Sequence, residues 1–102
     1  MRAEIKVSGI VQGVGFRPFI YRIAVANGLV GFVQNRGDAY VEIIVEGGNS
    51  NIVHFLQDLK NRKPPLAKIQ QIITKYEEDK NEFQAFSIKK RKRTGNVNFV
   101  SF

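Results

Sequence analysis

A glycine-rich loop between a strand-like segment and a helical one is the feature that most constrains the fold of this chain. Residues 3–11 (AEIKVSGIV) alternate apolar and polar side chains, which is typical of a β-strand. The loop 12–15 (QGVG) follows, and apolar residues then recur from Phe16 at the spacing of one helical face. Pro18 suits a first helical turn because the N–H groups there lack helical partners. We therefore predict a strand, a loop and a helix that runs from Pro18 to Asn27.

The remaining chain predicts one more helix and further strands. Asn27-Gly28 is a stop signal for the first helix, and Pro64-Pro65 follows the end of the second. The expected elements are a strand over 29–35, a turn over 36–38, a strand over 39–46, a helix that carries Ile52, Phe55, Leu56 and Leu59 on its apolar face with an N-cap at Asn49 or Ser50, a strand over 67–76, a polar turn over 77–82 and a strand over 83–89. The order is βαββαβ with its last strand doubled or bent. Two helices then cover one face of a four- to five-stranded antiparallel sheet, an α+β sandwich of the ferredoxin-like kind.

One compact domain accounts for the length of 102 residues. We assign residues 1–90 to this domain and residues 91–102 to a basic C-terminal tail. Within the tail, Val97, Phe99 and Val100 could dock as an added strand.

The net charge of +7 comes mostly from five consecutive basic residues, Lys89 to Arg93. A short terminal run of one charge is usually a solvated strand end or tail. The alternative is a functional patch for an anion or a nucleic acid. The sequence leaves both interpretations open.

The composition excludes several kinds of chemistry. There is no cysteine, which excludes disulfides, a thiolate nucleophile and cysteine-ligated zinc. The single histidine, His54, falls off the apolar face of the second helix, so we expect it at the surface or its boundary rather than at a metal. We expect neither a metal nor a cofactor. Nothing near the N-terminus resembles a signal peptide, and no run reaches the ~20 apolar residues of a membrane span, so we expect a cytoplasmic monomer with no membrane partner.

The loop after the first strand has the composition of an anion site. The first turn of a helix offers unpaired backbone N–H groups and the positive end of its dipole. Gly13 and Gly15 lack side chains, so the backbone from Gln12 to Arg17 can curl with several N–H groups pointing inward. Arg17 adds a planar, permanently charged fork. No Gly-Lys-Ser/Thr follows, and the glycine spacing is not that of a dinucleotide site. The loop therefore favours a small phosphate-bearing ligand, although such a loop by itself can also be a tight turn.

Two motifs resemble those of the acylphosphatase family. Residues 9–17 (GIVQGVGFR) resemble its signature, which is a glycine, then Val-Gln-Gly-Val, one variable residue and Phe-Arg. Residues 31–38 (GFVQNRGD) resemble its second element, a strand that ends in Asn and runs into an Asp-containing turn. Residues 18–22 (PFIYR) and 64–69 (PPLAKI) are similar to the N-terminal acylphosphatase-like domain of the hydrogenase-maturation carbamoyltransferase. The resemblance covers residues 3–89.

The resemblance implies hydrolysis of small carboxyl-phosphates, either an acyl phosphate or carbamoyl phosphate, to a carboxylate and phosphate without a metal. It implies that Arg17 and Asn35 are the catalytic residues: Arg17 holds the phosphoryl oxygens and Asn35 orients the attacking water. The phosphate-binding residues that it implies are Gln12, Gly13, Val14, Gly15, Phe16 and Arg17.

One position departs from the family pattern. The family usually has glycine after the turn aspartate, whereas Ala39 follows Asp38 here. A glycine at such a point commonly supplies a positive φ. We expect Gly37 to take that role, with the turn shifted by one residue.

Two alternative functions remain. The first is a basic ferredoxin-like module that binds RNA or an acidic partner, and the second is a domain that binds carbamoyl phosphate without hydrolysing it. RNA recognition by such a sheet needs exposed aromatic residues on the central strands. Tyr40 is the only aromatic residue of the predicted 39–46 strand, so the sequence does not favour a nucleic-acid partner.

Overall fold

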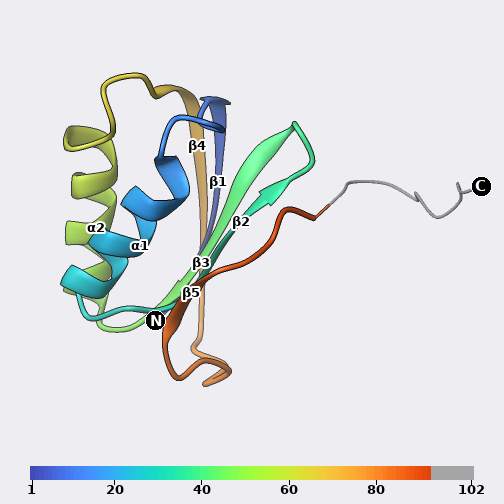
Figure 1. Ribbon diagram of the computed structural model, residues 1–102. Helices are drawn as coiled ribbons and strands as arrows, with labels where there is room; N and C mark the ends of the chain where they lie inside the picture. Colours follow the sequence, from blue (N-terminus) through green and yellow to red (C-terminus); the bar gives the residue numbers. More distant parts are fainter. Residues whose placement is uncertain (93–102) are drawn as a thin grey trace, which may run out of the picture.

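The computed structural model describes residues 1–92, and these form one five-stranded sheet with two helices on one of its faces (Figure 1). The elements in chain order are β1 (Arg2–Ile10), α1 (Phe16–Ala26), β2 (Val30–Arg36), β3 (Tyr40–Glu46), α2 (Asn49–Asn61), β4 (Lys68–Glu77) and β5 (Phe86–Ile88). The strand order across the sheet is β4-β1-β3-β2-β5. The predicted ferredoxin-like βαββαβ order is therefore confirmed. The added strand predicted around Val97 to Val100 lies outside the described residues.

The sheet is mixed rather than wholly antiparallel, because β5 pairs parallel with β2 while the other neighbouring strands pair antiparallel. The expected antiparallel sheet is thus wrong at this edge. The cause is topological: β4 ends at the same end of the sheet at which β2 begins, and the chain crosses to the opposite edge before β5 starts (Figure 1). A strand that starts there can only run in the direction of β2.

The last strand is also shorter than the predicted 83–89. Phe83 lies in the connection before β5, where its ring packs edge-on against Phe32 with the centroids 5.8 Å apart. The guanidinium of Arg2 lies 5.6 Å from the Phe83 centroid. Phe83 therefore covers the sheet face opposite the helices instead of extending the strand.

Arg2 holds that connection against the sheet. Its Nη1 donates to Glu46 Oε2 and to Glu82 Oε1, each at 2.9 Å, and its Nε donates to Glu77 Oε2 at 3.3 Å. Burial by itself would lower the pKa of Arg2, but the hydrogen bonds to Glu46 and Glu82 outweigh it and raise the pKa above its ordinary value. The charged network thus ties β1, β3, β4 and the connection together.

The core lies between the helices and the covered face of the sheet. Both predicted helical faces are confirmed, with Leu56 only partly buried. Side chains from the sheet that contribute to the core are Ala3, Ile5, Val7, Val33, Val41, Ile43, Val45 and Phe86, and those from the helices are Phe16, Phe19, Ile20, Ile23, Ala24, Ile52, Phe55 and Leu59. Alternation along the strands therefore decides which residues face the helices.

The first helix begins two residues earlier than predicted. Gly15 is its N-cap with φ 77°, a conformation that few other residues adopt, and this lets Phe16 enter the helix directly. At the other end, Gly28 has φ 67° and donates its N–H to Val25 O at 3.0 Å, while Leu29 N–H donates to Ala24 O at 2.9 Å. This pair of bonds is a Schellman motif, so the predicted stop is confirmed.

The second helix has a different N-cap from the predicted one. Gly48 occupies that position, and Asn49 and Ser50 both lie inside the first turn. Asn51, in the first turn of α2, instead donates its Nδ2 to Asn27 O at 3.0 Å. This bond links the start of α2 to the end of α1. The prediction of Asn49 or Ser50 as the N-cap is wrong because no side-chain cap is used here.

The close pairing of β2 with β3 leads to a stability prediction at Gly31. This residue has φ 139°, and a Cβ atom added to it would lie 1.9 Å from Ile44 O. We expect Gly31→Ala to lower the free energy of unfolding by about 3 kcal/mol, since both the φ and the backbone contact must be relieved. Urea denaturation measures the change. Gly48→Ala is the matched control: a Cβ at Gly48 would come no closer than 3.6 Å to its neighbours, and the loss should stay below about 1 kcal/mol. Equal losses in the two variants would contradict the prediction.

Candidate active site

The loop between β1 and α1 has the backbone of an anion-binding nest. Gly13 has φ 74° and Gly15 has φ 77°, and a Cβ at either position would meet nothing within 4 Å. The backbone angles, rather than a lack of space, are therefore what requires glycine. Phe19 N–H donates to Gly15 O at 3.2 Å and begins the helical ladder, so the N–H groups of Phe16 and Arg17 have no partner within the helix. These N–H groups and the loop before them are free to point at an anion.

Arg17 lies on the first turn of α1, with its side chain partly exposed. Its Nη1 donates to Lys89 O at 3.2 Å. No other hydrogen bond of its guanidinium is found within residues 1–92, so the rest of the fork remains available to an anion. Arg17 thus stands where the start of the helix meets the segment that follows β5.

Asn35 on β2 faces the helices, in line with the buried residues Gly31 and Val33. Its exposure is 6%, and in the part of the chain that the structure describes its Oδ1 has no hydrogen-bond partner. Leaving a buried acceptor unpaired costs about 1–3 kcal/mol, so such atoms usually serve a ligand or a water molecule. Asn35 therefore offers a buried carbonyl oxygen that the fold itself does not use.

A side-chain bond brings the loop and the strand of Asn35 together. Gln12 Nε2 donates to Gly37 O at 3.1 Å, which ties the loop to the turn between β2 and β3. Gly37 has φ 59°, as expected, and Ala39 N–H donates to Arg36 O at 3.2 Å to close the turn. Ala39 itself needs no positive φ, so this turn does not require the glycine that the family usually has there.

Two further residues of the predicted phosphate-binding set, Phe16 and Val14, have side chains that pack into or against the core. Phe16 is 1% exposed, and its ring packs near that of Phe19 in the core, with the centroids 6.0 Å apart. Val14 is partly buried and packs against the same core. Only the N–H groups of these two residues can therefore meet an anion.

The sequence did not indicate that the basic run lies beside this site. Residues 89–92 continue from β5 along the edge of β2 and approach the β2–β3 turn (Figure 1). The backbone bonds are Lys89 N–H to Val33 O at 2.9 Å, Lys92 N–H to Asn35 O at 2.8 Å and Gly37 N–H to Lys92 O at 2.7 Å. Alternation in 83–89 could have suggested a strand end, but no local pattern names its pairing partner.

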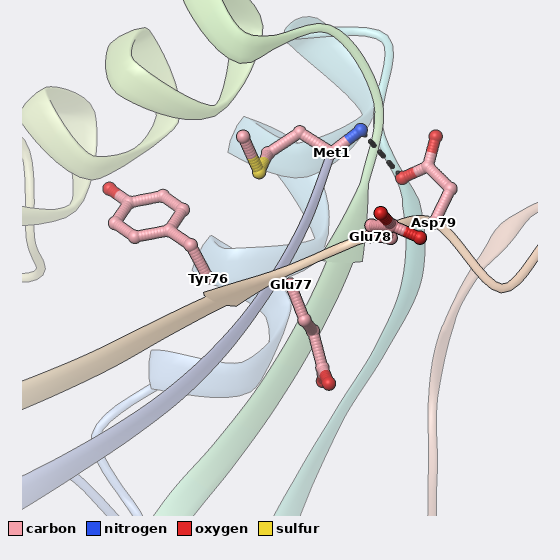
Figure 2. Close-up of a pocket in the computed structure, with 5 residues that line it drawn as sticks. All are labelled: Met1, Tyr76, Glu77, Glu78 and Asp79. Atoms are coloured by element: carbon pink, nitrogen blue, oxygen red, sulfur yellow. Dashed lines mark ion pairs between the residues drawn. The ribbon is translucent and has the colours of Figure 1, made fainter.

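Another hollow on the molecule is chemically unsuited to phosphate. Its volume is about 390 Å³, and it lies at the start of β1, whereas the glycine loop follows the end of that strand (Figure 2). Its lining includes Glu77, Glu78 and Asp79, and the N-terminal amine of Met1 pairs with Asp79 Oδ1 at 2.7 Å. Three carboxylates disfavour an anionic ligand.

The other candidates from the sequence play no part in the site. His54 is exposed on α2, as predicted. No group of three or more His, Cys, Asp or Glu side chains suited to a metal occurs among residues 1–92. Over the same residues, neither helix is long and apolar enough to cross a membrane.

Comparison with known proteins decides the family. The acylphosphatase family profile matches residues 3–88. The chain belongs to the acylphosphatase family. Acylphosphatases are metal-independent enzymes, and the family implies acyl phosphates as substrates.

Relatives of this acylphosphatase domain include carbamoyltransferases and acylphosphatases. A probable carbamoyltransferase HypF of Methanocaldococcus jannaschii is 52% identical over 88 residues, which are 86% of this chain and 11% of that protein. A crystal structure of full-length HypF in a phosphate- and nucleotide-bound form superposes with a TM-score of 0.87 and 38% identity, covering 92% of this chain and 12% of that one. The crystal structure of acylphosphatase from Bacillus subtilis superposes with a TM-score of 0.80 and 37% identity, covering 85% of this chain and 96% of that one. The chain thus spans about a tenth of the length of the carbamoyltransferases it matches.

The φ of Gly15 gives a test of the loop. We expect Gly15→Ala to weaken binding of inorganic phosphate and to cost about 1 kcal/mol of stability, because alanine resists the left-handed conformation of this N-cap. Gly15→Asn should recover part of both, since asparagine tolerates that conformation better. Titration calorimetry with phosphate and urea denaturation measure the two effects. Phosphate affinity that is the same in the Gly15, Ala and Asn proteins would show that the loop backbone does not bind the anion.

Proposed function

We propose that this acylphosphatase domain hydrolyses small carboxyl-phosphates through Arg17, the loop 12–17 and Asn35. The observation that carries the proposal is the buried, unpaired Oδ1 of Asn35, which lies on the strand that Gln12 ties to the glycine loop. An anion-binding backbone and a water-orienting amide are the two components that hydrolysis of an activated phosphate requires.

The phosphoryl group binds to the loop and to Arg17. N–H groups from Gln12 to Arg17 and the guanidinium of Arg17 donate to its oxygens. These donors are fixed before the substrate arrives, so they stabilise the charge of the transition state without reorganisation. The backbone N–H groups set the geometry, and Arg17 supplies the full positive charge.

Asn35 orients the attacking water. Its Oδ1 accepts a hydrogen bond from the water, and the water oxygen attacks phosphorus while the bond from phosphorus to the acyl oxygen breaks. The carboxylate leaves, and the water proton passes to the phosphate that is formed. No protein nucleophile is needed because the carboxylate is already a good leaving group; the chain has no cysteine, and His54 is exposed on α2.

We propose carbamoyl phosphate as a substrate beside simple acyl phosphates. The support is the 52% identity to a probable carbamoyltransferase and the segments 18–22 and 64–69, which are similar to that class of protein. Carbamoyl phosphate has the same mixed anhydride bond as an acyl phosphate, so the same residues serve both.

The structure does not favour an RNA-binding module. Phe32 on the open face of the sheet is already in contact with Phe83. Lys89 Nζ lies 3.8 Å from the centroid of the Phe32 ring. Lys6 Nζ lies 5.2 Å from the centroid of Tyr40. These aromatic rings are thus engaged rather than presented for stacking on bases.

A hydrolysis assay tests the proposal. The purified protein should release phosphate from benzoyl phosphate and from carbamoyl phosphate at rates that EDTA does not change, with inorganic phosphate as a competitive inhibitor. Phosphate release is the measured quantity. Tight binding of carbamoyl phosphate without release would instead support the non-catalytic binding domain.

Two substitutions separate binding from turnover. Asn35→Ala should lower kcat about 100-fold and leave the inhibition constant of phosphate nearly unchanged, since it removes only the amide that orients water. Arg17→Gln should abolish turnover and also weaken phosphate inhibition, because it removes charge from the binding site. Steady-state kinetics with benzoyl phosphate provide both constants.

Arg62→Gln, at the exposed C-cap of α2, is the matched control for the loss of an arginine. Its kinetics should equal those of the unmodified protein. A wild-type rate in Asn35→Ala would refute the role given to that residue.

A further inference from the structure

We infer that residues 89–92, which we call the β5 extension, are a positioning element for the active site. Their backbone is bonded to both Asn35 and Arg17, the two residues that carry the proposed reaction. The inference rests on the proposed function for its catalytic consequence. The contacts themselves do not depend on the proposed function.

At its far end the β5 extension is bonded to the strand end that holds Asn35. Lys92 N–H donates to Asn35 O at 2.8 Å, and Lys92 O accepts from Gly37 N–H at 2.7 Å. On the other side of β2, Asn35 is paired with Val41 of β3. Asn35 is therefore held from both sides of its strand, and a shift of Lys92 moves the backbone from which its amide projects.

At its near end the β5 extension meets Arg17. Lys89 N–H donates to Val33 O at 2.9 Å, which places Lys89 O within 3.2 Å of Arg17 Nη1. A neutral carbonyl oxygen orients the guanidinium without neutralising its charge. The same short segment thus orients the binding residue at one end and the water-orienting residue at the other.

Two side-chain contacts hold the β5 extension between these ends. Gln34 Nε2 donates to Lys90 O at 2.9 Å, and Arg91 pairs with Asp38 in the β2–β3 turn. Arg91 therefore links the β5 extension to the same turn that Gln12 ties to the glycine loop. The turn is held from both directions.

The side chains of the β5 extension are all exposed, so the segment adds nothing to the buried core. The β5 extension acts on the position of Asn35 through backbone hydrogen bonds on the edge of β2. Loss of such a bond should affect the geometry of Asn35 more than the stability of the fold. This contrast separates a positioning role from a structural one.

The test removes one backbone donor and keeps the rest of the chain. Lys92→Pro lacks the N–H that donates to Asn35 O, whereas Lys92→Ala keeps the N–H and loses only the lysine side chain beyond Cβ. We expect kcat for benzoyl phosphate to be about tenfold lower in Lys92→Pro than in Lys92→Ala, since small misplacements of an orienting group cost rate steeply. The inhibition constant of phosphate should agree within about twofold between the two, because Lys89 keeps its own bonds.

Lys90→Pro controls for the introduction of a proline into this segment. No backbone hydrogen bond from Lys90 N–H is found within the described part of the chain, so this variant should behave as Lys90→Ala does. Thermal unfolding of each protein shows whether the fold is retained.

A charge exchange provides a second test that keeps every backbone donor. Arg91→Asp places two carboxylates together and should lower kcat a few-fold. Asp38→Arg in the same protein restores the pair with reversed charges and should recover most of that loss. If Lys92→Pro does not fold, the recovery of kcat in the charge-exchanged protein tests whether the β5 extension positions the active site.

The side-chain amide signals of Asn35 in nitrogen–proton NMR spectra give a readout that does not depend on turnover. They should shift in Lys92→Pro relative to Lys92→Ala and not in Lys90→Pro relative to Lys90→Ala. Equal kcat values for the two Lys92 variants, with unchanged Asn35 signals, would overturn the inference. If the unmodified protein hydrolyses neither benzoyl nor carbamoyl phosphate, the proposed function fails, and the Asn35 signals alone decide the positioning role.

Discussion

Hydrogen bonds along both edges of β2 determine where the buried amide of this domain lies. The strand pairs with β3 on one side, and on the other with β5 and then with residues 89–92. Because side chains alternate along a strand, this pairing turns Asn35 toward the helices, on the same face as Val33. Gln12 then brings the glycine loop to the turn that follows Asn35. The proposed anion site thus depends on a strand that is fixed from both sides.

The proposed site uses both backbone groups and side chains. The N–H groups at the start of α1 have positions fixed by the φ values of Gly13 and Gly15, and they need no side chain to bind an anion. Arg17 adds charge, and Asn35 adds a buried acceptor that nothing else in residues 1–92 occupies. Such a division suits a substrate that is already activated, because the protein needs only to position it and to stabilise charge.

The sequence predicted the parts of this structure that depend on local patterns. Alternation and helical spacing predicted the element order and the core faces, and the glycine loop with its motif identified the family. What it missed depends on pairing between distant segments. The parallel edge formed by β5 follows from where β4 ends, and Phe83 leaves the predicted strand because Phe32 and Arg2 lie across from it. The hydrogen bond between Arg17 and Lys89 joins residues far apart in the chain. Neither the glycine-loop motif around Arg17 nor the alternation that leads up to Lys89 predicts it.

The atom that water attacks, phosphorus or the acyl carbon, is the feature of the proposed mechanism that isotope labelling measures. Hydrolysis of benzoyl phosphate by the protein in ¹⁸O-labelled water, with EDTA present, shows which atom the water attacks. We expect one labelled oxygen in inorganic phosphate and none in benzoate, because the loop and Arg17 hold the phosphoryl group for attack by a water that Asn35 orients. Label in benzoate would mean attack at the acyl carbon and would contradict the mechanism.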